Sequence, residues 1–475
     1  MTKRTINIIL IITGTIGFVT VFWWLNADPT KDFIVNLEGA DNRGEGNAFV
    51  QEVAIGEHFE SFSEDFTPLT ETWTNFRGAD FDNISKSPVK LVDGFGTEGP
   101  DIKWSMELGE GHSGAAIWKG LAYILDYDEE ERADFLRCIS LTDGTELWKR
   151  GYDVAIKRNH GMSRTIPAVT EDYIVTIGPK CHVMCLDRET GEMRWGLDVV
   201  KEYQNEIPFW YTGQCPLIDN GVAIIATGGS KMMVAVDCET GEKLWETPNP
   251  KGWKMSHSSV MPFTFGGRKM YVYSPVGGML AVAADGPDAG QVLWETSAWN
   301  HSVVAPSPVC LPDGKIFMTA GYGAGSMLLQ LRENNGAFTI ETLDEYAPKD
   351  GLACEQQTPV LWNDHLFGIM PKDGGANRNQ LICVHPDNPK EVVWSSGKES
   401  RFGLGPYFIA DNKMFILSDD GTLTIARPSV EKYIQLEQVK IIENGHDAWA
   451  PFALADGYLL LRDSKTMVCI DLNVK

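Results

Sequence analysis

Positive charge is scarce in this chain. Its 475 residues include 41 Lys and Arg against 65 Asp and Glu, which gives a formal net charge of −24. Such a chain repels phosphate groups, so the composition argues against nucleic acid and against an anionic membrane surface as partners. The same balance favours solubility and leaves basic partners open.

Cysteine is also scarce, and the nine cysteines have no disulfide pattern. An odd number without regular spacing argues against a disulfide scaffold. Four of them recur at one position of a repeated strand, where cysteine acts as a small buried hydrophobe: Cys138, Cys185, Cys383 and Cys469. A metal site at Cys181, His182 and Cys185 is the alternative, although a single histidine accompanies the two thiols.

Residues 6–25 form an uncharged apolar run, long enough to cross a bilayer as a helix. Lys3 and Arg4 precede the run, and Trp23 and Trp24 stand at its far end, where aromatic rings favour the membrane interface. The best cleavage site is poor, and no cysteine follows for lipidation. We expect a retained signal anchor, with a cleaved signal sequence or a buried helix as alternatives. The rest of the chain then lies outside the cytoplasm.

Most of the chain repeats a unit that ends in a turn followed by tryptophan. The unit reads CISLTDGTELW at 138–148, VMCLDRETGEMRW at 183–195, VAVDCETGEKLW at 234–245 and ICVHPDNPKEVVW at 382–394. LAVAADGPDAGQVLW at 280–294 is a longer variant, and a degenerate copy places Ile340 where tryptophan is expected. Period-2 apolar patterns separated by Gly and Asp turns are typical of antiparallel strands.

Prolines mark the same repeat independently. They recur at intervals of 45 to 51 residues: Pro167, Pro216, Pro262, Pro308, Pro359, Pro406 and Pro451. With Ala115 in the first copy, this makes eight units of four strands each, which is the pattern of propeller blades. The eighth unit lacks its fourth strand, and IKWSMEL at 102–108 is an orphan strand that completes it and removes an exposed edge.

We therefore predict an all-β protein, an eight-bladed β-propeller of four-stranded antiparallel blades closed by its N- and C-terminal strands. Residues 73–475 form the propeller, residues 1–25 the transmembrane helix, and residues 26–72 an acidic tether and cap.

The alternating strand followed by Asp-x-x-Thr-Gly-x-x-x-Trp resembles the repeat of pyrroloquinoline-quinone-type propellers. That family includes quinoprotein alcohol dehydrogenases and the propeller lipoprotein of the outer-membrane protein assembly machine. The resemblance covers about residues 73–475 and is specific for the fold, whereas function resides in sites grafted onto it. It implies that a set of tryptophans packs against the turns of neighbouring blades: Trp104, Trp148, Trp195, Trp245, Trp294 and Trp394. The segment TWTNFRG at 72–78 resembles segments that open such propellers, and we expect it to plug one face, with Arg77 as a candidate binding residue.

In four copies a histidine stands five to seven residues before a proline. Because each proline begins an innermost strand, the preceding residues lie at one mouth of the central channel. The mouth then carries a polar and aromatic ring: His112, His160, Arg164, Trp210, Tyr211, Gln214, His257, His301, Glu355, Gln356, Arg401, His446, Asp447 and Trp449. These side chains either satisfy the loop backbone, or form a pocket for a small ligand, a peptide or a partner loop, or support catalysis or a metal. Mutual repulsion predicts histidine pKa values below 6.5 and anion binding that tightens as the pH falls.

GYGAGS at 321–326 resembles a dinucleotide loop, but no helix follows it. We interpret it as the hairpin before the third strand of blade five.

Quinoprotein enzymes of the resembling family use a bound quinone, calcium and a catalytic Asp, and many carry a disulfide between adjacent cysteines, a pair that is missing here. We therefore expect a non-catalytic protein on the inner membrane, with its propeller on the periplasmic side and without cofactor or metal. It binds an envelope protein partner or a small anionic or quinone ligand. A PQQ-dependent dehydrogenase with calcium is the alternative, and a hydrolase or redox accessory subunit is another.

Overall fold

The computed structural model describes residues 2–26 and 52–474. An N-terminal helix and the remainder of the chain are separate units. The helix α1 (Lys3–Asn26) is long and apolar enough to cross a membrane between Lys3 and Trp24, a property that a signal sequence shares. The part of the expected tether at residues 27–51 lies outside the described residues.

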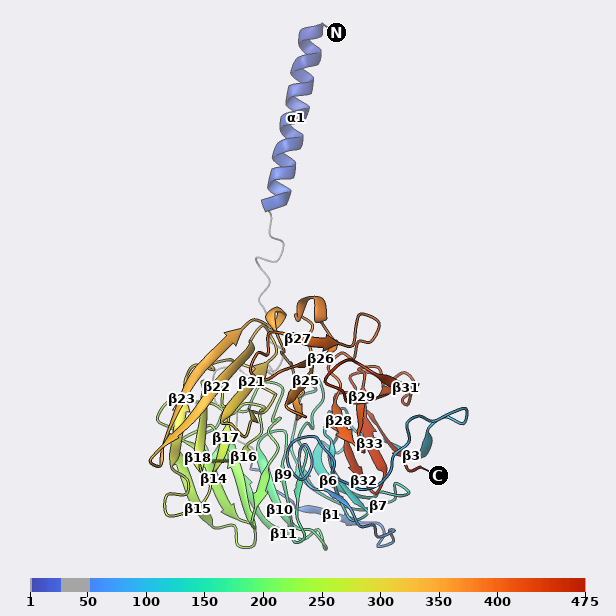
Figure 1. The fold of residues 1–475 in the computed structure, drawn as a ribbon, viewed down its shortest axis with the longest axis vertical. Coiled ribbons are helices and arrows are strands. Elements are labelled where there is room, and N and C mark those ends of the chain that lie inside the picture. Colours follow the sequence, from blue (N-terminus) through green and yellow to red (C-terminus); the bar gives the residue numbers. More distant parts are fainter. Residues whose placement is uncertain (1, 27–51, 475) are drawn as a thin grey trace. The chain divides into compact units, whose positions relative to one another are not determined.

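The remainder is an eight-bladed propeller, as predicted (Figure 1). Blades 1 and 2 are β4 (Ala115–Trp118), β5 (Leu121–Asp128), β6 (Ala133–Ser140), β7 (Glu146–Asp153), and β8 (Ala168–Val169), β9 (Tyr173–Ile177), β10 (His182–Asp187), β11 (Met193–Asp198). Blades 3 and 4 are β12 (Leu217–Asp219), β13 (Val222–Ala226), β14 (Lys231–Asp237), β15 (Lys243–Pro248), and β16 (Met261–Phe265), β17 (Arg268–Tyr273), β18 (Met279–Ala283), β19 (Val292–Thr296).

Blades 5 and 6 are β20 (Val309–Cys310), β21 (Lys315–Ala320), β22 (Gly325–Asn334), β23 (Ala337–Tyr346), and β24 (Val360–Trp362), β25 (His365–Ile369), β26 (Leu381–Val384), β27 (Val392–Ser395). Blades 7 and 8 are β28 (Tyr407–Ala410), β29 (Lys413–Leu417), β30 (Thr422–Ala426), β31 (Gln435–Lys440), and β32 (Ala453–Ala455), β33 (Tyr458–Arg462), β34 (Thr466–Asp471), β3 (Asp101–Glu107). Short helices α2 (Val199–Tyr203), η1 (Pro348–Asp350) and η2 (Gly375–Asn377) lie in the connections.

The two ends of the propeller chain pair to close the ring, as the sequence predicts. Strand β3 is the outermost strand of blade 8 and runs antiparallel to β34, with Trp104 opposite Cys469. In Figure 1 the C-terminus lies beside β3. Without β3, blade 8 would expose the hydrogen-bonding edge of β34.

Tryptophans pack between blades against the turn of the next blade. Gly144 in the turn of blade 1 has φ 76°, and a Cβ there would lie 2.8 Å from the ring of Trp104 in blade 8. The same contact recurs in the pairs Trp148–Gly191, Trp195–Gly241 and Trp245–Gly290. Indole N–H groups donate to carbonyls of the next blade in the pairs Trp104–Leu141, Trp195–Cys238 and Trp394–Ser429, at 2.8 to 3.0 Å. Trp294 is buried with Ile316 and Met318 of blade 5.

Blades 5 and 7 depart from this pattern. In the other blades, the tryptophan pairs with a residue of the third strand directly before a register shift between the third and fourth strands. In blade 5 the two residues paired directly before this shift are Leu328 and Asp344. The expectation that Ile340 takes this place is therefore wrong, because β22 and β23 extend past the usual turn and displace the register. In blade 7 the equivalent pair is Ile425 with Glu437.

The C-terminal part of the acidic segment contributes strands to blade 1. Strand β1 (His58–Ser61) adds to the outer edge of β7, and β2 (Thr72–Trp73) adds to the inner edge of β4. The blade 1 sheet therefore has six strands, and residues 58–61 of the expected tether and cap form one of them.

Residues 70–91 cover the face formed by the turns between the first and second strands of the blades. Backbone N–H groups of Glu71 and Leu91 donate to Asp456 and Asp411, in the turns of blades 8 and 7, at 2.9 and 3.0 Å. The segment thus covers the face opposite to that from which the innermost strands begin.

From that face the expected plug enters the channel. Trp73 is buried, pairs with Ile117 of β4, and meets Phe408 of β28 edge-on at 5.8 Å. Arg77 is buried and donates from Nη2 to the carbonyl of Pro359 at 3.0 Å. These contacts reach blades 1, 6 and 7, so the segment links non-adjacent blades across the channel.

Candidate ligand-binding face at the propeller mouth

The predicted ring residues lie on the connections that lead into the innermost strands. His112 follows β3, His160 and Arg164 follow β7, and Trp210, Tyr211 and Gln214 follow α2. The others follow the outer strands of blades 3 to 7: His257, His301, Glu355, Gln356, Arg401, His446, Asp447 and Trp449. All therefore stand on connections at the face opposite the plug.

Some of these side chains hold the loops together. Gln214 is buried and exchanges two hydrogen bonds with the backbone of Ala226. The hydroxyl of Tyr211 donates to the carbonyl of Lys157 at 2.7 Å, and Arg401 donates to the carbonyl of Arg378. For these three residues the backbone-satisfying interpretation describes the contacts that the structure shows.

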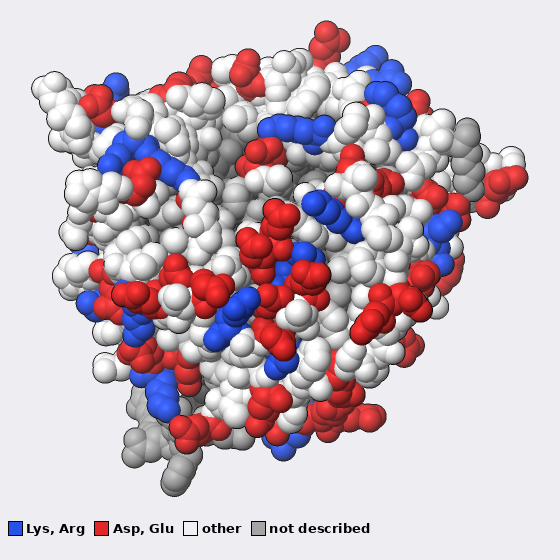
Figure 2. Space-filling view, turned by 90° about the horizontal axis from the view of Figure 1, so that it is seen from below, with Lys and Arg blue, Asp and Glu red and all other residues white. Residues whose placement is uncertain are grey.

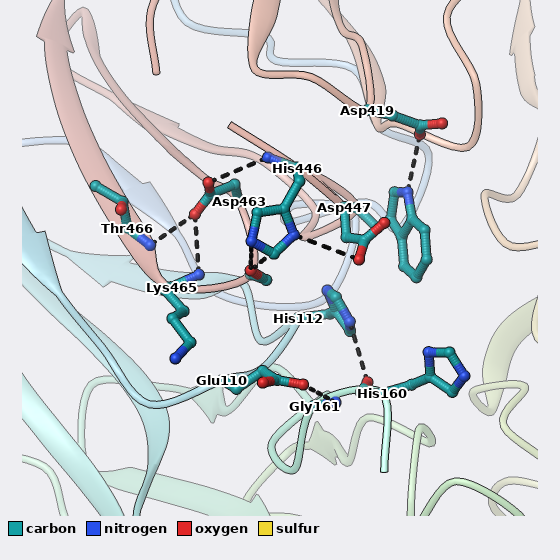
Figure 3. A network of polar contacts seen from close by, with 12 residues as sticks. Glu110, His112, His160, Gly161, Asp419, His446, Asp447, Asp463, Lys465 and Thr466 are labelled. Atoms are coloured by element: carbon teal, nitrogen blue, oxygen red, sulfur yellow. Dashed lines mark hydrogen bonds and ion pairs between the residues drawn. The ribbon is translucent and has the colours of Figure 1, made fainter. Parts of the chain in front are cut away.

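His112 and His446 lie in the polar network drawn in Figure 3, and Trp449 contacts His112 and Asp419 of the same network. His112 is buried, its Nε2 lies 3.1 Å from the carbonyl of His160, and its ring lies 4.9 Å from that of Trp449. Trp449 Nε1 donates to Asp419 at 2.8 Å, and His446 contacts Ser464 and Asp447. These contacts link loops of blades 7 and 8 to the connection between β3 and β4 that carries His112.

A second group is aromatic. Trp210 stacks on Tyr322 with ring centroids 5.5 Å apart, and its ring lies 6.3 Å from that of His257. His301 instead lies against Trp299, at 4.3 Å between ring centroids. The sequence did not single out Tyr322, which stands in the β21–β22 hairpin that was interpreted as structural.

The pKa values of His112, His257 and His301 are lowered, but mainly by burial rather than by the predicted mutual repulsion. Burial lowers the pKa of His112 well below its usual range and that of His257 to about 3, and the charge of Arg164 is the second cause for both. Burial also lowers the pKa of His301. His257 is therefore neutral between pH 5 and 7, so its titration cannot tighten anion binding across that range.

A belt of hydrogen bonds around the channel was missed by the sequence analysis. The N–H groups of Ile166, Cys215, Ser259 and Ser307 donate in turn to the side chains of Cys215, Ser259, Ser307 and Thr358, each on the next blade, at 2.9 to 3.3 Å. The available signal was the small polar residue directly before the proline in blades 3, 5 and 6.

One acidic side chain near the mouth is held by the loops around it. Asp419 accepts hydrogen bonds from Trp449 and from the N–H of Leu404, so it is engaged with the loops. Among the described residues, the His, Cys, Asp and Glu side chains close enough to share an ion are Glu57, His58 and Asp153, at the outer edge of blade 1. Across the face shown in Figure 2, acidic side chains are interspersed with Lys and Arg.

The cysteine motif of blade 2 is not a ligand cluster either. Cys181 Sγ lies 3.1 Å from Thr212 Oγ1, while Cys185 Sγ donates to the carbonyl of Cys238 in blade 3 at 3.4 Å. Burial raises the pKa of Cys383 to about 12, as expected of a packed thiol.

The closed ring, the tryptophan–turn contacts and the plugged channel define a PQQ-type β-propeller. The family model described as outer membrane protein assembly factor BamB matches residues 132–396, more than half of the chain, and the chain belongs to this family. Comparison with curated protein sequences finds no match.

Solved structures show the same fold at low identity. BamB from Moraxella catarrhalis is 12% identical with a TM-score of 0.50, covering 78% of this chain and 99% of its own. Quinohemoprotein alcohol dehydrogenase ADHIIG from Pseudomonas putida HK5 is 13% identical with a TM-score of 0.58, covering 85% and 81%. The computationally designed Ika8 protein is 12% identical with a TM-score of 0.50, covering 78% and 99%. Likeness at these identities concerns the fold alone, because binders and enzymes share it.

Proposed function

We propose that this protein is a membrane-anchored, non-catalytic propeller that binds envelope protein partners outside the cytoplasm. Helix α1, with Lys3 and Arg4 at its start, holds the chain in the inner membrane, and the propeller lies on the periplasmic side. Membership in the BamB family supports a binding role.

The observation that carries the proposal is a difference between the two faces of the propeller. The chain's own segment with Trp73 and Arg77 fills the turn face, while the mouth presents loops from successive blades. One acidic group on this face holds the loops together: Asp463 accepts from the N–H groups of His446, Lys465 and Thr466. A rigid loop surface of this kind suits recognition of another protein.

The test is chemical crosslinking in intact membranes, followed by purification of the full-length chain and identification of what is joined to it. The proposal predicts a reproducible envelope protein adduct and no visible absorbance from the purified protein. A quinone chromophore that purifies with the chain in stoichiometric amount would instead establish the dehydrogenase alternative.

A further inference from the structure

The aromatic group at the mouth is exposed. Side chains of Tyr322 and Phe209 are 63% and 42% exposed, and both flank Trp210, whose ring contacts each of them. They reach this place from two distant segments, the connection after α2 and the β21–β22 hairpin. Exposed aromatic side chains that cluster in this way are characteristic of sites that bind another molecule.

The backbone under these rings is strained. Trp210, Tyr211 and Tyr322 have φ values of 57°, 70° and 57°, in the left-handed region that bulky side chains rarely adopt. Such strain persists only where the surrounding structure enforces it, and it concentrates at functional sites. Three aromatic residues in this conformation on one face point to a use for their positions.

A cation, Arg164, lies beside this group; among the described residues it forms no direct ion pair, although Glu110 is near enough to attract it. Arg164 Nη2 donates to the carbonyls of Asn159, His160 and Gly161 at 2.6 to 3.1 Å, whereas its Nε is buried without an acceptor. Within the described ranges, its guanidinium forms no ion pair with a carboxylate. Burial lowers the pKa of Arg164 to about 10, so the group stays charged at neutral pH and calls for an anion.

His257 connects the cation to the rings. Its ring lies 6.3 Å from that of Trp210, and the guanidinium of Arg164 is near enough to lower its pKa. Because His257 is neutral, Arg164 supplies the positive charge. The site therefore combines a fixed cation with adjacent flat apolar surfaces.

We propose that Arg164, Trp210 and Tyr322 receive a peptide segment of a partner protein in which a carboxylate adjoins an aromatic side chain. The carboxylate pairs with the guanidinium, and the aromatic ring stacks on Tyr322 and Trp210. A small molecule fits less well, since small-ligand sites enclose most of their ligand and Tyr322 stands largely in solvent. The proposal rests on the binding function proposed above and names the chemistry of the partner.

The test uses the full-length protein in detergent and a blocked peptide, acetyl-Gly-Gly-Asp-(4-fluoro-Phe)-Gly-Gly-amide, followed by fluorine NMR. We expect saturable broadening of the fluorine signal and binding about tenfold weaker when Asn replaces the peptide's Asp, the loss typical of one charge-assisted hydrogen bond. Acetate serves as a competitor. If acetate displaces the peptide with an affinity equal to that of the peptide itself, the site is a simple anion site and the proposal fails.

Two variants locate the binding. Arg164→Gln is expected to weaken binding to the level of the Asn peptide. Tyr322→Gly removes the ring and relieves a φ of 57°, so it should weaken binding without lowering the melting temperature. Phe62→Ala, which removes an aromatic side chain 52% exposed beside β1, is the matched control and should bind normally. Equal binding by wild type and Tyr322→Gly would overturn the proposal even if Arg164→Gln fails to fold.

The pH dependence separates the cation from the histidines. Pairing with Arg164 predicts the same affinity at pH 5.5 and pH 8, because the charge of Arg164 is unchanged between them. Binding that is several-fold tighter at pH 5.5 would assign recognition to a histidine and contradict the proposal. An envelope adduct in the membrane crosslinking experiment together with no peptide binding would refute this inference alone.

Discussion

Trp104 of β3 lies opposite Cys469 of β34, so a strand near the N-terminal end of the propeller is hydrogen-bonded to the last strand of the chain. The indole of Trp104 packs on Gly144 of blade 1 and donates to the carbonyl of Leu141 at 2.8 Å. Trp104 therefore takes part in the strand pairing within blade 8 and also packs blade 8 against blade 1. Closure of the ring depends on this strand.

Deleting β3 (Asp101–Glu107) should open the ring. The edge of β34 and the turn of blade 1 would become exposed, so we expect aggregation or a large fall in melting temperature. Deleting β1 (His58–Ser61) is the control, because β1 only adds to an already complete blade. If both deletion variants melt at the same temperature as wild type, closure does not depend on β3.

The inter-blade tryptophans should differ in how much each contributes to the free energy of unfolding. Trp148 is 7% exposed, and Trp148→Ala should cost about 3–5 kcal/mol of unfolding free energy, as for other buried aromatic truncations. Trp245 packs on Gly290 but is half-buried, so Trp245→Ala should cost less. Urea unfolding of both variants measures the difference, and equal costs would contradict the packing described.

His257 should make the protein less stable in acid. Its pKa falls from about 6.5 in the unfolded chain to about 3 in the folded one, so as the pH drops through this window only the unfolded chain takes up the proton. Stability is lost as the pH falls below 6.5. We expect His257→Gln to gain stability relative to wild type between pH 7.5 and pH 5, measured by urea midpoints. An unchanged difference at the two pH values would show that His257 titrates normally.

Asp134 should act in the opposite direction. It is fully buried between Tyr152 and Ser163, and burial raises its pKa from 3.8 to about 7. Between these values the folded chain holds a proton that the unfolded chain releases, so stability falls as the pH rises from about 4 to about 7 and levels off above that. Asp134→Asn should therefore be more stable, relative to wild type, at pH 8 than at pH 5. Parallel pH profiles of the melting temperature would contradict this.

The fold was predictable because its packing leaves a period in the sequence. Prolines, turn glycines and tryptophans record the start, turn and contact of each blade, and the orphan strand around Trp104 records closure. Ile340 misled because lengthening the β22–β23 hairpin shifts the register to Asp344 without changing local composition. The register depends on how two strands pair, and the sequence of one strand alone does not determine this.

The mouth was only partly predictable. Loop position follows from the repeat, so the connections with His257 and Arg164 could be placed on one face. Tyr322 comes from a hairpin inside a blade, and only the folded sheet brings it beside Trp210. The cause of the histidine shifts was also out of reach, because burial is a property of packing rather than of charge spacing.

Site-specific photo-crosslinking in living cells tests the central claim most directly. A benzophenone amino acid replaces Tyr322 at the mouth, and in a matched variant it replaces Phe62 beside β1, where the native side chain is similarly exposed. If the mouth is the binding face of a membrane-anchored propeller, the position 322 probe yields a discrete envelope protein adduct and the position 62 probe does not. The account is contradicted if the partner is captured from position 62 while position 322 stays uncrosslinked.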